Sequence, residues 1–222
     1  MERTERLGRY TLLLTEDCFP LGGDSLALGR FATVRRGWKV CDLGCGSGVL
    51  GLLLLEREES LSLTGVERSP AAADVARQTF ARNGLDARVV TGDLRDRRLF
   101  PANAFDLVIS NPPWFPTGAG KSGGPARSEE GCTLMELCAA AGYLTRPGGR
   151  FALVHRPERL PDLFAALREN GLEPKRMALL QHSLSTPPSA ALVEAVRQGR
   201  PGLEVLPVQL QEGPQSGAGP QA

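Results

Sequence analysis

The sequence lacks long apolar runs. Nowhere in its 222 residues does an uninterrupted apolar stretch approach the roughly 18–20 residues that a membrane-spanning helix needs. Residues 1–10 carry several charges where a secretion signal would be apolar. We therefore expect a soluble, cytoplasmic protein. A hydrophobic fraction of 41% is enough to bury the core of one α/β domain at this length, and no second full domain is expected.

Cysteine and net charge are also scarce. The five cysteines show no CxxC pair or zinc-like spacing, and their odd number leaves no complete disulfide pairing, so we expect free thiols in the core or in loops. A formal net charge of +1 argues against a strongly basic nucleic-acid-binding protein, and any RNA contact must come from a local patch. Of the 26 basic residues 23 are Arg, which suits planar contacts to phosphates and bases, although an Arg-rich genome gives the same excess.

Short β-prone runs alternate with helical stretches from residue 38 to about residue 197. This alternation is typical of a parallel sheet covered by helices on both faces. The expected strands are 39–43, 61–66, 87–91, 105–110 and 150–155, and the expected helices are 49–57, 71–83, 132–144 and 160–170. Two later β-prone runs, 176–182 and 191–197, are separated only by a Ser/Thr/Pro loop and permit a closing hairpin.

The chain divides into three parts. Residues 1–37 precede the first core strand and form an appended segment, with a candidate strand at 11–15 and a candidate helix at 25–33. Residues 38–210 form the α/β domain. Residues 211–222 are mostly Gly, Pro, Gln, Ser and Ala with almost nothing to bury, so we expect a disordered tail.

A glycine-rich turn follows the first core strand, where residues 40–48 read VCDLGCGSG. Gly44, Gly46 and Gly48 permit backbone angles and a close ligand approach that a Cβ would block. Nicotinamide enzymes instead carry GxGxxG and bind a pyrophosphate there. Asp42 would repel a diphosphate but suits the ammonium group of a methionine-derived ligand. Taken alone, the turn is also compatible with a purely structural role.

Two more acids follow the next two strands. Glu67 ends the second strand, where a carboxylate can accept hydrogen bonds from both hydroxyls of a ribose. Asp93 follows the third strand and can accept a hydrogen bond from an adenine amine, while Leu94 can cover the ring. Each acid alone is more often a helix cap or a solvated loop residue. Three acids at successive strand ends favour a nucleoside-like ligand, because open α/β sheets bind ligands at the carboxyl ends of their strands.

The fourth strand ends in Asn111, Pro112, Pro113 and Trp114. Two prolines stiffen the turn and leave carbonyls without competing N–H groups. If Asn111 Oδ1 and the Pro112 carbonyl each accept one hydrogen of an aryl or amide NH₂, the nitrogen can pyramidalise and attack an electrophilic carbon. Trp114 offers a flat face for stacking a base or an amide. Read alone, the motif is an ordinary turn and Trp114 a core anchor.

Other polar residues are weaker candidates. His155 and His182 have no Cys or Ser partner, so we expect structural roles for both. A glycine-rich loop at 118–124 carries Lys121 and is followed by Arg127. This loop suits a mobile lid or a phosphate contact, and equally a plain flexible connection.

With these residues in place, the chain resembles the S-adenosylmethionine (SAM) dependent methyltransferase superfamily of class I over roughly residues 38–197. Residues 42–48 match its first motif, Glu67 its second and Asp93 its third. The resemblance implies a Rossmann-like seven-stranded sheet with helices on both faces and an antiparallel last strand. It also implies SAM as cofactor and a site without metal. The cofactor-binding residues it implies are Asp42, Gly44, Gly46, Gly48, Glu67, Asp93, Leu94 and Asn111, and the catalytic residues are Asn111, Pro112, Pro113 and Trp114.

More narrowly, the chain resembles the bacterial tRNA (adenine-N6) methyltransferases that modify valine tRNA. The resemblance rests on the segments 21–28, 111–115, 126–129 and 147–160. It departs at Trp114, where that group usually has Tyr. It implies methylation of the exocyclic N6 of an adenine in tRNA.

Two alternatives stay open. Methyltransferases acting on the N5 of a protein glutamine share the turn of Asn, two prolines and an aromatic residue, but they usually carry a helical N-terminal domain, and only about 37 residues precede the core here. A catalytically idle SAM-binding or RNA-binding scaffold is the other alternative. The intact Asp42, Glu67, Asp93 and Asn111 argue against it.

Overall fold

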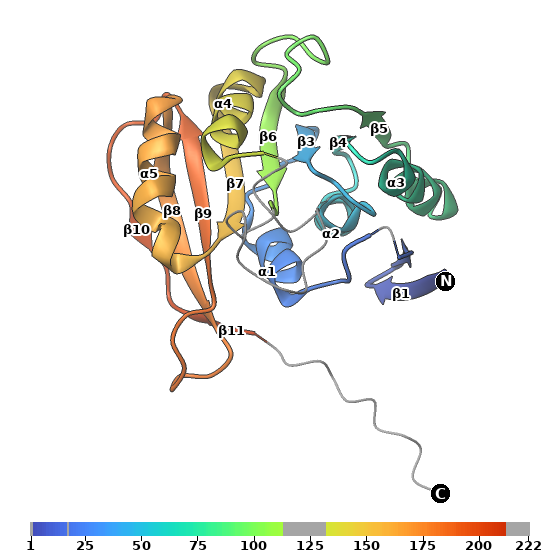
Figure 1. Ribbon diagram of the computed structural model, residues 1–222, viewed down its shortest axis with the longest axis horizontal. Helices are drawn as coiled ribbons and strands as arrows, with labels where there is room; N and C mark the ends of the chain where they lie inside the picture. Colours follow the sequence, from blue (N-terminus) through green and yellow to red (C-terminus); the bar gives the residue numbers. More distant parts are fainter. Residues whose placement is uncertain (1, 17, 113–131, 212–222) are drawn as a thin grey trace, which may run out of the picture.

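The computed structural model describes residues 2–16, 18–112 and 132–211. Its main body is one large β-sheet with helices on both faces (Figure 1), which confirms the predicted Rossmann-like α/β fold. The core strands are β3 (Lys39–Leu43), β4 (Ser62–Glu67), β5 (Arg88–Thr91), β6 (Phe105–Ser110), β7 (Thr145–His155), β8 (Leu172–Gln181) and β9 (Ala190–Arg197). The helices are α1 (Gly23–Phe31), α2 (Val49–Arg57), α3 (Pro70–Arg82), α4 (Leu134–Leu144) and α5 (Leu160–Glu169).

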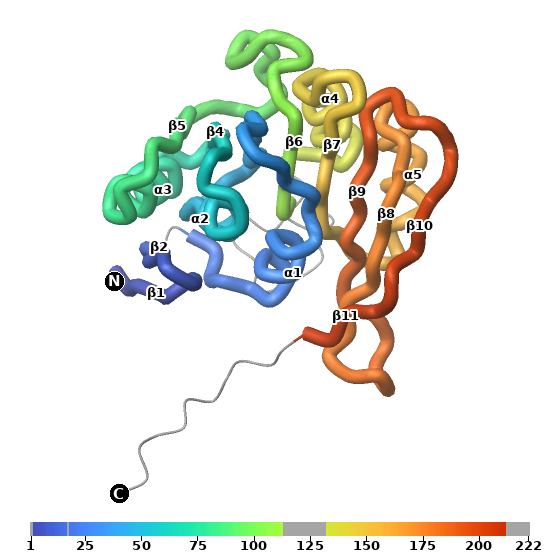
Figure 2. Tube along the Cα trace, turned by 180° about the vertical axis from the view of Figure 1, so that it is seen from behind, coloured from blue at the N-terminus to red at the C-terminus, as the bar shows by residue number. Residues whose placement is uncertain are grey.

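The core strands lie in the order β8-β9-β7-β6-β3-β4-β5. β9 is antiparallel to both β7 and β8, which confirms the predicted closing hairpin, and Figure 2 shows the three strands side by side. The expectation of seven strands needs correction. Within the described residues the sheet has nine, because β10 (Glu204–Val205) and β11 (Gln209–Leu210) pair with β8 in parallel. They satisfy backbone groups that an edge strand would otherwise expose.

Each face of the sheet has its own apolar core. α1, α2 and α3 cover one face, where Leu28, Leu52 and Phe80 pack on inward side chains of the strands. α4 and α5 cover the other face, with Cys138 and Leu167 at its centre. Successive residues of a strand point to opposite faces, so Val40 belongs to the first core and Cys41 to the second.

The N-terminal residues form a separate antiparallel hairpin, β1 (Arg3–Leu7) and β2 (Tyr10–Leu14), outside the main sheet. The candidate strand at 11–15 corresponds to β2, whereas β1 was not expected. β2 packs on α3, where Asn83 donates to the Thr11 carbonyl at 2.7 Å and accepts the Thr11 N–H at 2.8 Å. The described part of residues 1–37 thus shares the core on the α1 face, and the division at residue 37 stays a prediction.

A buried ionic cluster fixes the end of α1 to the sheet. Glu194 of β9 is fully buried and accepts hydrogen bonds from the Thr33 N–H at 2.7 Å and its hydroxyl at 2.9 Å. The same carboxylate pairs with Arg150 at 2.7 Å and Arg176 at 3.2 Å. This cluster holds α1 over the sheet and so helps to place the first turn of α1 at the edge described next.

Candidate active site

The predicted site residues that the structure describes follow four neighbouring parallel strands. β3 pairs with β4 and with β6, and β4 pairs with β5, all in parallel register. The carboxyl ends of these strands therefore lie along one edge of the sheet. Asp42 and the glycine turn, Glu67, Asp93 and Asn111 come together at this edge.

The turn after β3 has the backbone that its glycines predict. Gly44, Gly46 and Gly48 have φ angles of 75°, 52° and 89°, in the left-handed region that favours glycine. A Cβ on Gly44 or Gly46 would meet no atom within 4 Å, so open space lies against the main chain there. A Cβ on Gly48 would lie 2.8 Å from the ring of Phe80. The first two glycines thus form a cradle, and the third lets α2 begin close to α3.

Glu67 ties the glycine turn to the loop before α3. Its Oε2 accepts the Gly46 N–H at 3.0 Å and its Oε1 accepts the Ser69 N–H at 2.8 Å. The turn is also held to β4 because the Val66 carbonyl accepts the N–H of Gly44 at 2.8 Å. A carboxylate oxygen has more than one acceptor direction, so these bonds leave Glu67 able to accept from a ribose.

Asp42 is a buried acid without a compensating partner. Its side chain is 1% exposed, and neither carboxylate oxygen has a hydrogen-bond partner in the described structure. Burial, with a smaller contribution from the charge of Glu67, raises the pKa of Asp42 to about 8. Burying a charge without a partner is costly. A cationic ligand at this edge, such as the ammonium group of SAM, would relieve that cost, and the cradle leaves room beside it.

Asp93 lies at the same edge but already has a partner. Arg95 donates its Nε to Asp93 Oδ1 at 2.9 Å and also reaches Glu136 of α4 at 3.2 Å. Hydrogen bonds from Arg95 hold the pKa of Asp93 below its usual range despite partial burial. An adenine amine that binds Asp93 must therefore share this carboxylate with Arg95 or displace Arg95 from it. The sequence analysis did not predict the contact between Asp93 and Arg95.

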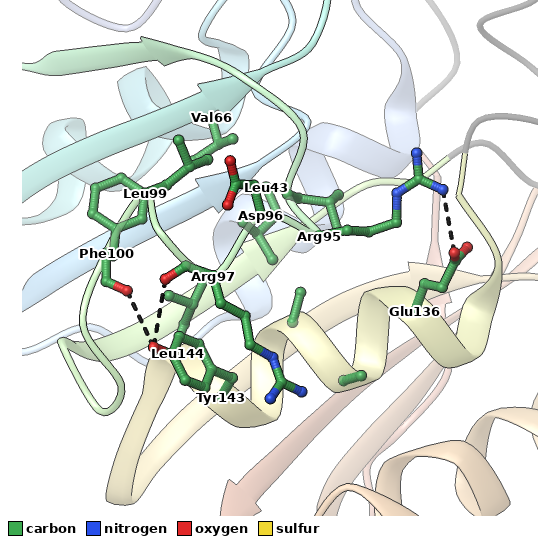
Figure 3. Close-up of a pocket in the computed structure, with 13 residues that line it drawn as sticks. Leu43, Val66, Arg95, Asp96, Arg97, Leu99, Phe100, Glu136, Tyr143 and Leu144 are labelled. Carbon is green, nitrogen blue, oxygen red and sulfur yellow. Dashed lines mark hydrogen bonds and ion pairs between the residues drawn. The ribbon is translucent and has the colours of Figure 1, made fainter.

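A cavity of about 170 Å³ lies between the loop after β5 and helix α4 (Figure 3). Its floor is the sheet, at Leu43 and Val66, and Leu94 is part of its wall. Arg95 and Glu136 form an ion pair among the residues that line it (Figure 3). Leu94, which was predicted to cover an adenine ring, therefore lines a cavity.

Asn111 follows β6 and contacts the N-terminal segment. Its Nδ2 donates to Ser25 Oγ, in the first turn of α1, at 2.9 Å. The preceding residue, Ser110, is buried and donates to the Leu43 carbonyl at 2.7 Å, which fixes the end of β6 to the end of β3. Asn111 and Pro112 are partly buried. Pro113 and Trp114 lie outside the described residues.

The cysteines and His155 lie where the sequence predicts structural roles. All five cysteines, Cys18, Cys41, Cys45, Cys132 and Cys138, are free, as predicted. His155 is buried at the end of β7, which fits a structural role. The loop at 118–129, with Lys121 and Arg127, lies outside the described residues. In the described part of the chain no group of His, Cys, Asp and Glu could hold a metal ion. No helix there is long and apolar enough to cross a membrane.

Sequence reasoning missed two contacts, those of Ser25 with Asn111 and of Asp24 with Gln211. Ser25 was expected to begin a helix, Asp24 was noted as part of a segment that carries the resemblance, and Gln211 was assigned to the tail. Gln211 Nε2 in fact donates to Asp24 Oδ1 at 2.7 Å. No local pattern signals this contact, because its partners are 187 residues apart.

A glycine cradle, an orphaned buried acid and a strand-end carboxylate on this sheet define a class I methyltransferase architecture. The family model described as "Methyltransferase small domain" matches residues 23–165, and the chain belongs to this family. It is a SAM-dependent methyltransferase, and the cradle beside Asp42 fits the cofactor that this class uses.

Curated relatives and solved structures agree with this assignment. The tRNA1(Val) (adenine(37)-N6)-methyltransferase of a Flavobacteriaceae bacterium (strain 3519-10) is 23% identical over 85% of this chain and 82% of the relative. The protein of the same name from Porphyromonas gingivalis (strain ATCC 33277) is 32% identical over 70% of this chain and 66% of the relative. A solved structure described as a "predicted O-methyltransferase" from Agrobacterium tumefaciens has a TM-score of 0.70 at 22% identity, covering 88% of this chain and 90% of that one. The solved structure shows likeness of fold.

Proposed function

We propose that this methyltransferase transfers a methyl group from SAM to the exocyclic N6 of an adenine in tRNA, the reaction named for its curated relatives. The observation that carries the proposal is the position of Asn111 and Pro112 directly after β6, beside the cradle after β3. Because tRNA is found in the cytoplasm, the proposal also places the protein there.

The proposed cofactor contacts divide among three strand ends. Gly44 and Gly46 would lie against the methionine portion of SAM, and Asp42 would compensate its ammonium group. Glu67 would accept from the ribose hydroxyls. Asp93 and Leu94 would receive the adenine. When bound there, SAM supplies a methyl group on a positively charged sulfur, and S-adenosylhomocysteine is left after its transfer.

The proposed catalytic contacts act on the target nitrogen. Its lone pair is delocalised into the adenine ring, so the neutral amine is a weak nucleophile. Asn111 Oδ1 and the Pro112 carbonyl each accept one N–H and draw the nitrogen out of the ring plane, which frees the lone pair for the methyl carbon. With SAM bound, the new N–C bond would form as the C–S bond of the cofactor breaks, and the surplus proton would leave to water. Trp114 would stack on the adenine.

The test uses tRNA from a bacterial strain without N6-methyladenosine in its tRNA, with ribosomal RNA and total protein in parallel. The full chain is incubated with SAM labelled in the methyl group, and the products are digested and analysed by mass spectrometry. N6-methyladenosine in tRNA is expected, and the Asn111→Ala variant serves as the low-turnover control. Label on glutamine side chains, or on no macromolecule, would refute the proposed substrate.

A further inference from the structure

The side-chain amide of Asn111 is asymmetric, and its orientation decides what it can do. Its oxygen accepts hydrogen bonds and its nitrogen donates them. An amine that must give up N–H bonds can use only the oxygen. In the structure Nδ2 donates to Ser25 Oγ at 2.9 Å, which leaves Oδ1 on the opposite side of the amide. After half a turn of the amide the Ser25 hydroxyl could donate to Oδ1 instead, so the contact fixes the position of the side chain, and only the orientation in the structure leaves Oδ1 free for the target amine.

Ser25 is itself held in place from two directions. Its backbone N–H donates to the Gly22 carbonyl at 3.1 Å within the first turn of α1. The adjacent Asp24 accepts the Gln211 side chain at 2.7 Å, while the Gln211 N–H donates to the Gln181 carbonyl at 2.8 Å at the end of β8. We call the Asp24–Gln211 contact the clasp. It joins the start of α1 to the sheet edge on which β11 pairs.

We propose that Ser25 is a positioning residue that holds the side chain of Asn111 where its Oδ1 can accept from the target nitrogen, and that the clasp keeps Ser25 within reach of Asn111. The inference rests on the proposed function, because it takes Asn111 as the acceptor of the target amine. Ser25 would act through Asn111, whose side chain it contacts.

The first test compares three variants of the full chain. Ser25→Ala removes the acceptor for Asn111 Nδ2, whereas Ser25→Thr keeps a hydroxyl. Ser60→Ala is the matched control, because Ser60 accepts from the Gly37 N–H at 2.8 Å and donates to Glu58 at 2.7 Å in the turns that precede β3 and β4, at their opposite ends. For each variant kcat, KM for tRNA, the Kd for SAM by calorimetry and the melting temperature are measured.

Ser25→Ala should lower kcat about five- to tenfold, the equivalent of one lost hydrogen bond. KM and the Kd for SAM should stay within about twofold, because the hydrogen bond that Asn111 accepts matters most as the target nitrogen pyramidalises. Ser25→Thr should recover most of the loss, and Ser60→Ala should turn over like the wild type. A normal kcat in a folded Ser25→Ala enzyme, or a loss confined to KM or to SAM affinity, would overturn the positioning role.

The clasp is tested by adding Gln211→Ala to Ser25→Ala, with Gln209→Ala in the adjacent strand β11 as the control. If the clasp works only through Ser25, Gln211→Ala alone should lower kcat and should add nothing to the loss caused by Ser25→Ala. Additive losses would show that Gln211 acts by another route. If Asn111→Ala keeps normal turnover, the proposed function fails. If Asn111→Ala loses turnover while Ser25→Ala does not, only this inference fails.

Discussion

Glu67 accepts the backbone N–H of Gly46 at 3.0 Å, so the acid that ends β4 holds the glycine turn that follows β3. A second bond, from Ser69 at 2.8 Å, ties the same carboxylate to the loop before α3. The residue proposed to bind the ribose of SAM therefore also stabilises the glycine turn. Replacing it should affect the cofactor in two ways.

Glu67→Ala should weaken SAM binding at least tenfold. It would remove the two proposed charge-assisted hydrogen bonds to the ribose, each contributing about 1.5–3 kcal/mol, and it frees the Gly46 N–H from its partner. Calorimetric titration of SAM measures the loss, and Glu169→Ala, which truncates an exposed acid of α5, controls for removal of a carboxylate. Unchanged affinity in a folded Glu67→Ala protein would show that Glu67 does not bind the cofactor.

Asn111→Ala and Trp114→Ala should fail in different ways. Asn111→Ala removes an acceptor that matters most as the nitrogen pyramidalises, so kcat should fall strongly while SAM affinity stays nearly intact. Trp114→Ala would remove the proposed stacking face, and stacking contributes about 1–3 kcal/mol per base, so KM for RNA should rise. Trp114→Phe should recover much of that loss. Steady-state kinetics with tRNA separate the two effects, and normal turnover by Asn111→Ala would contradict the proposed mechanism.

The sequence predicted the centre of the sheet well. β3, β6 and α2 begin and end where expected, because glycine, asparagine and proline punctuate buried apolar runs there. β7 starts five residues earlier than predicted, since its Pro-Gly-Gly stretch, which looks like a turn, forms an irregularity in the pairing with β6. β1 was missed because its sequence, RTERL, is mostly charged and exposed, and only its pairing with β2 makes it a strand.

The residues of the candidate site could be predicted from the sequence, but the hydrogen bonds between them could not. Asp42, Glu67 and Asn111 were identified because each lies at or next to the carboxyl end of a strand, and parallel strands bring these ends together. The bonds that join Asn111 to Ser25 and Asp93 to Arg95 depend on side-chain geometry in folded loops. No periodicity in the sequence encodes such geometry.

Asp42→Asn should flatten the pH dependence of the apo protein's stability. The pKa of Asp42 is raised to about 8 in the folded state from its ordinary 3.8, so the folded state binds a proton more tightly than the unfolded state. This group therefore destabilises the protein progressively as pH rises from about 4 to about 8, and its effect is constant above that range. The melting temperature of Asp42→Asn relative to wild type should rise across this interval, and scanning calorimetry at several pH values measures it.

The same variant should bind SAM less tightly, because it loses the carboxylate that is proposed to compensate the ammonium group. A constant difference in melting temperature from pH 4 to pH 8 would show that Asp42 ionises normally. Unchanged SAM affinity would remove Asp42 from the cofactor site.

Glu194→Gln should destabilise the fold without changing the chemistry directly. Glu194 is fully buried, and its partners Arg150 and Arg176 have side chains that are 22% and 29% exposed. Breaking a buried ion pair leaves a charge uncompensated, and because the arginines are partly solvated we expect a loss of about 2–4 kcal/mol in the free energy of unfolding. Urea denaturation measures it. Glu158→Gln, which breaks an exposed pair with Arg156, should cost less than about 1 kcal/mol; equal losses would contradict the assigned role of Glu194.

The position of β3 between β4 and β6 also has a consequence for folding kinetics. In the pairing of β3 with β4, Asp42 lies opposite Gly65. In the pairing of β3 with β6 it lies opposite Ile109, which is much farther away along the chain. Closing the longer loop costs more chain entropy and favours later formation. The half of the molecule that holds the glycine turn and Glu67 therefore has the shorter route to native structure. Asn111 reaches its place only when β6 pairs with β3. The proposed cofactor site should therefore form earlier in folding than the proposed catalytic site.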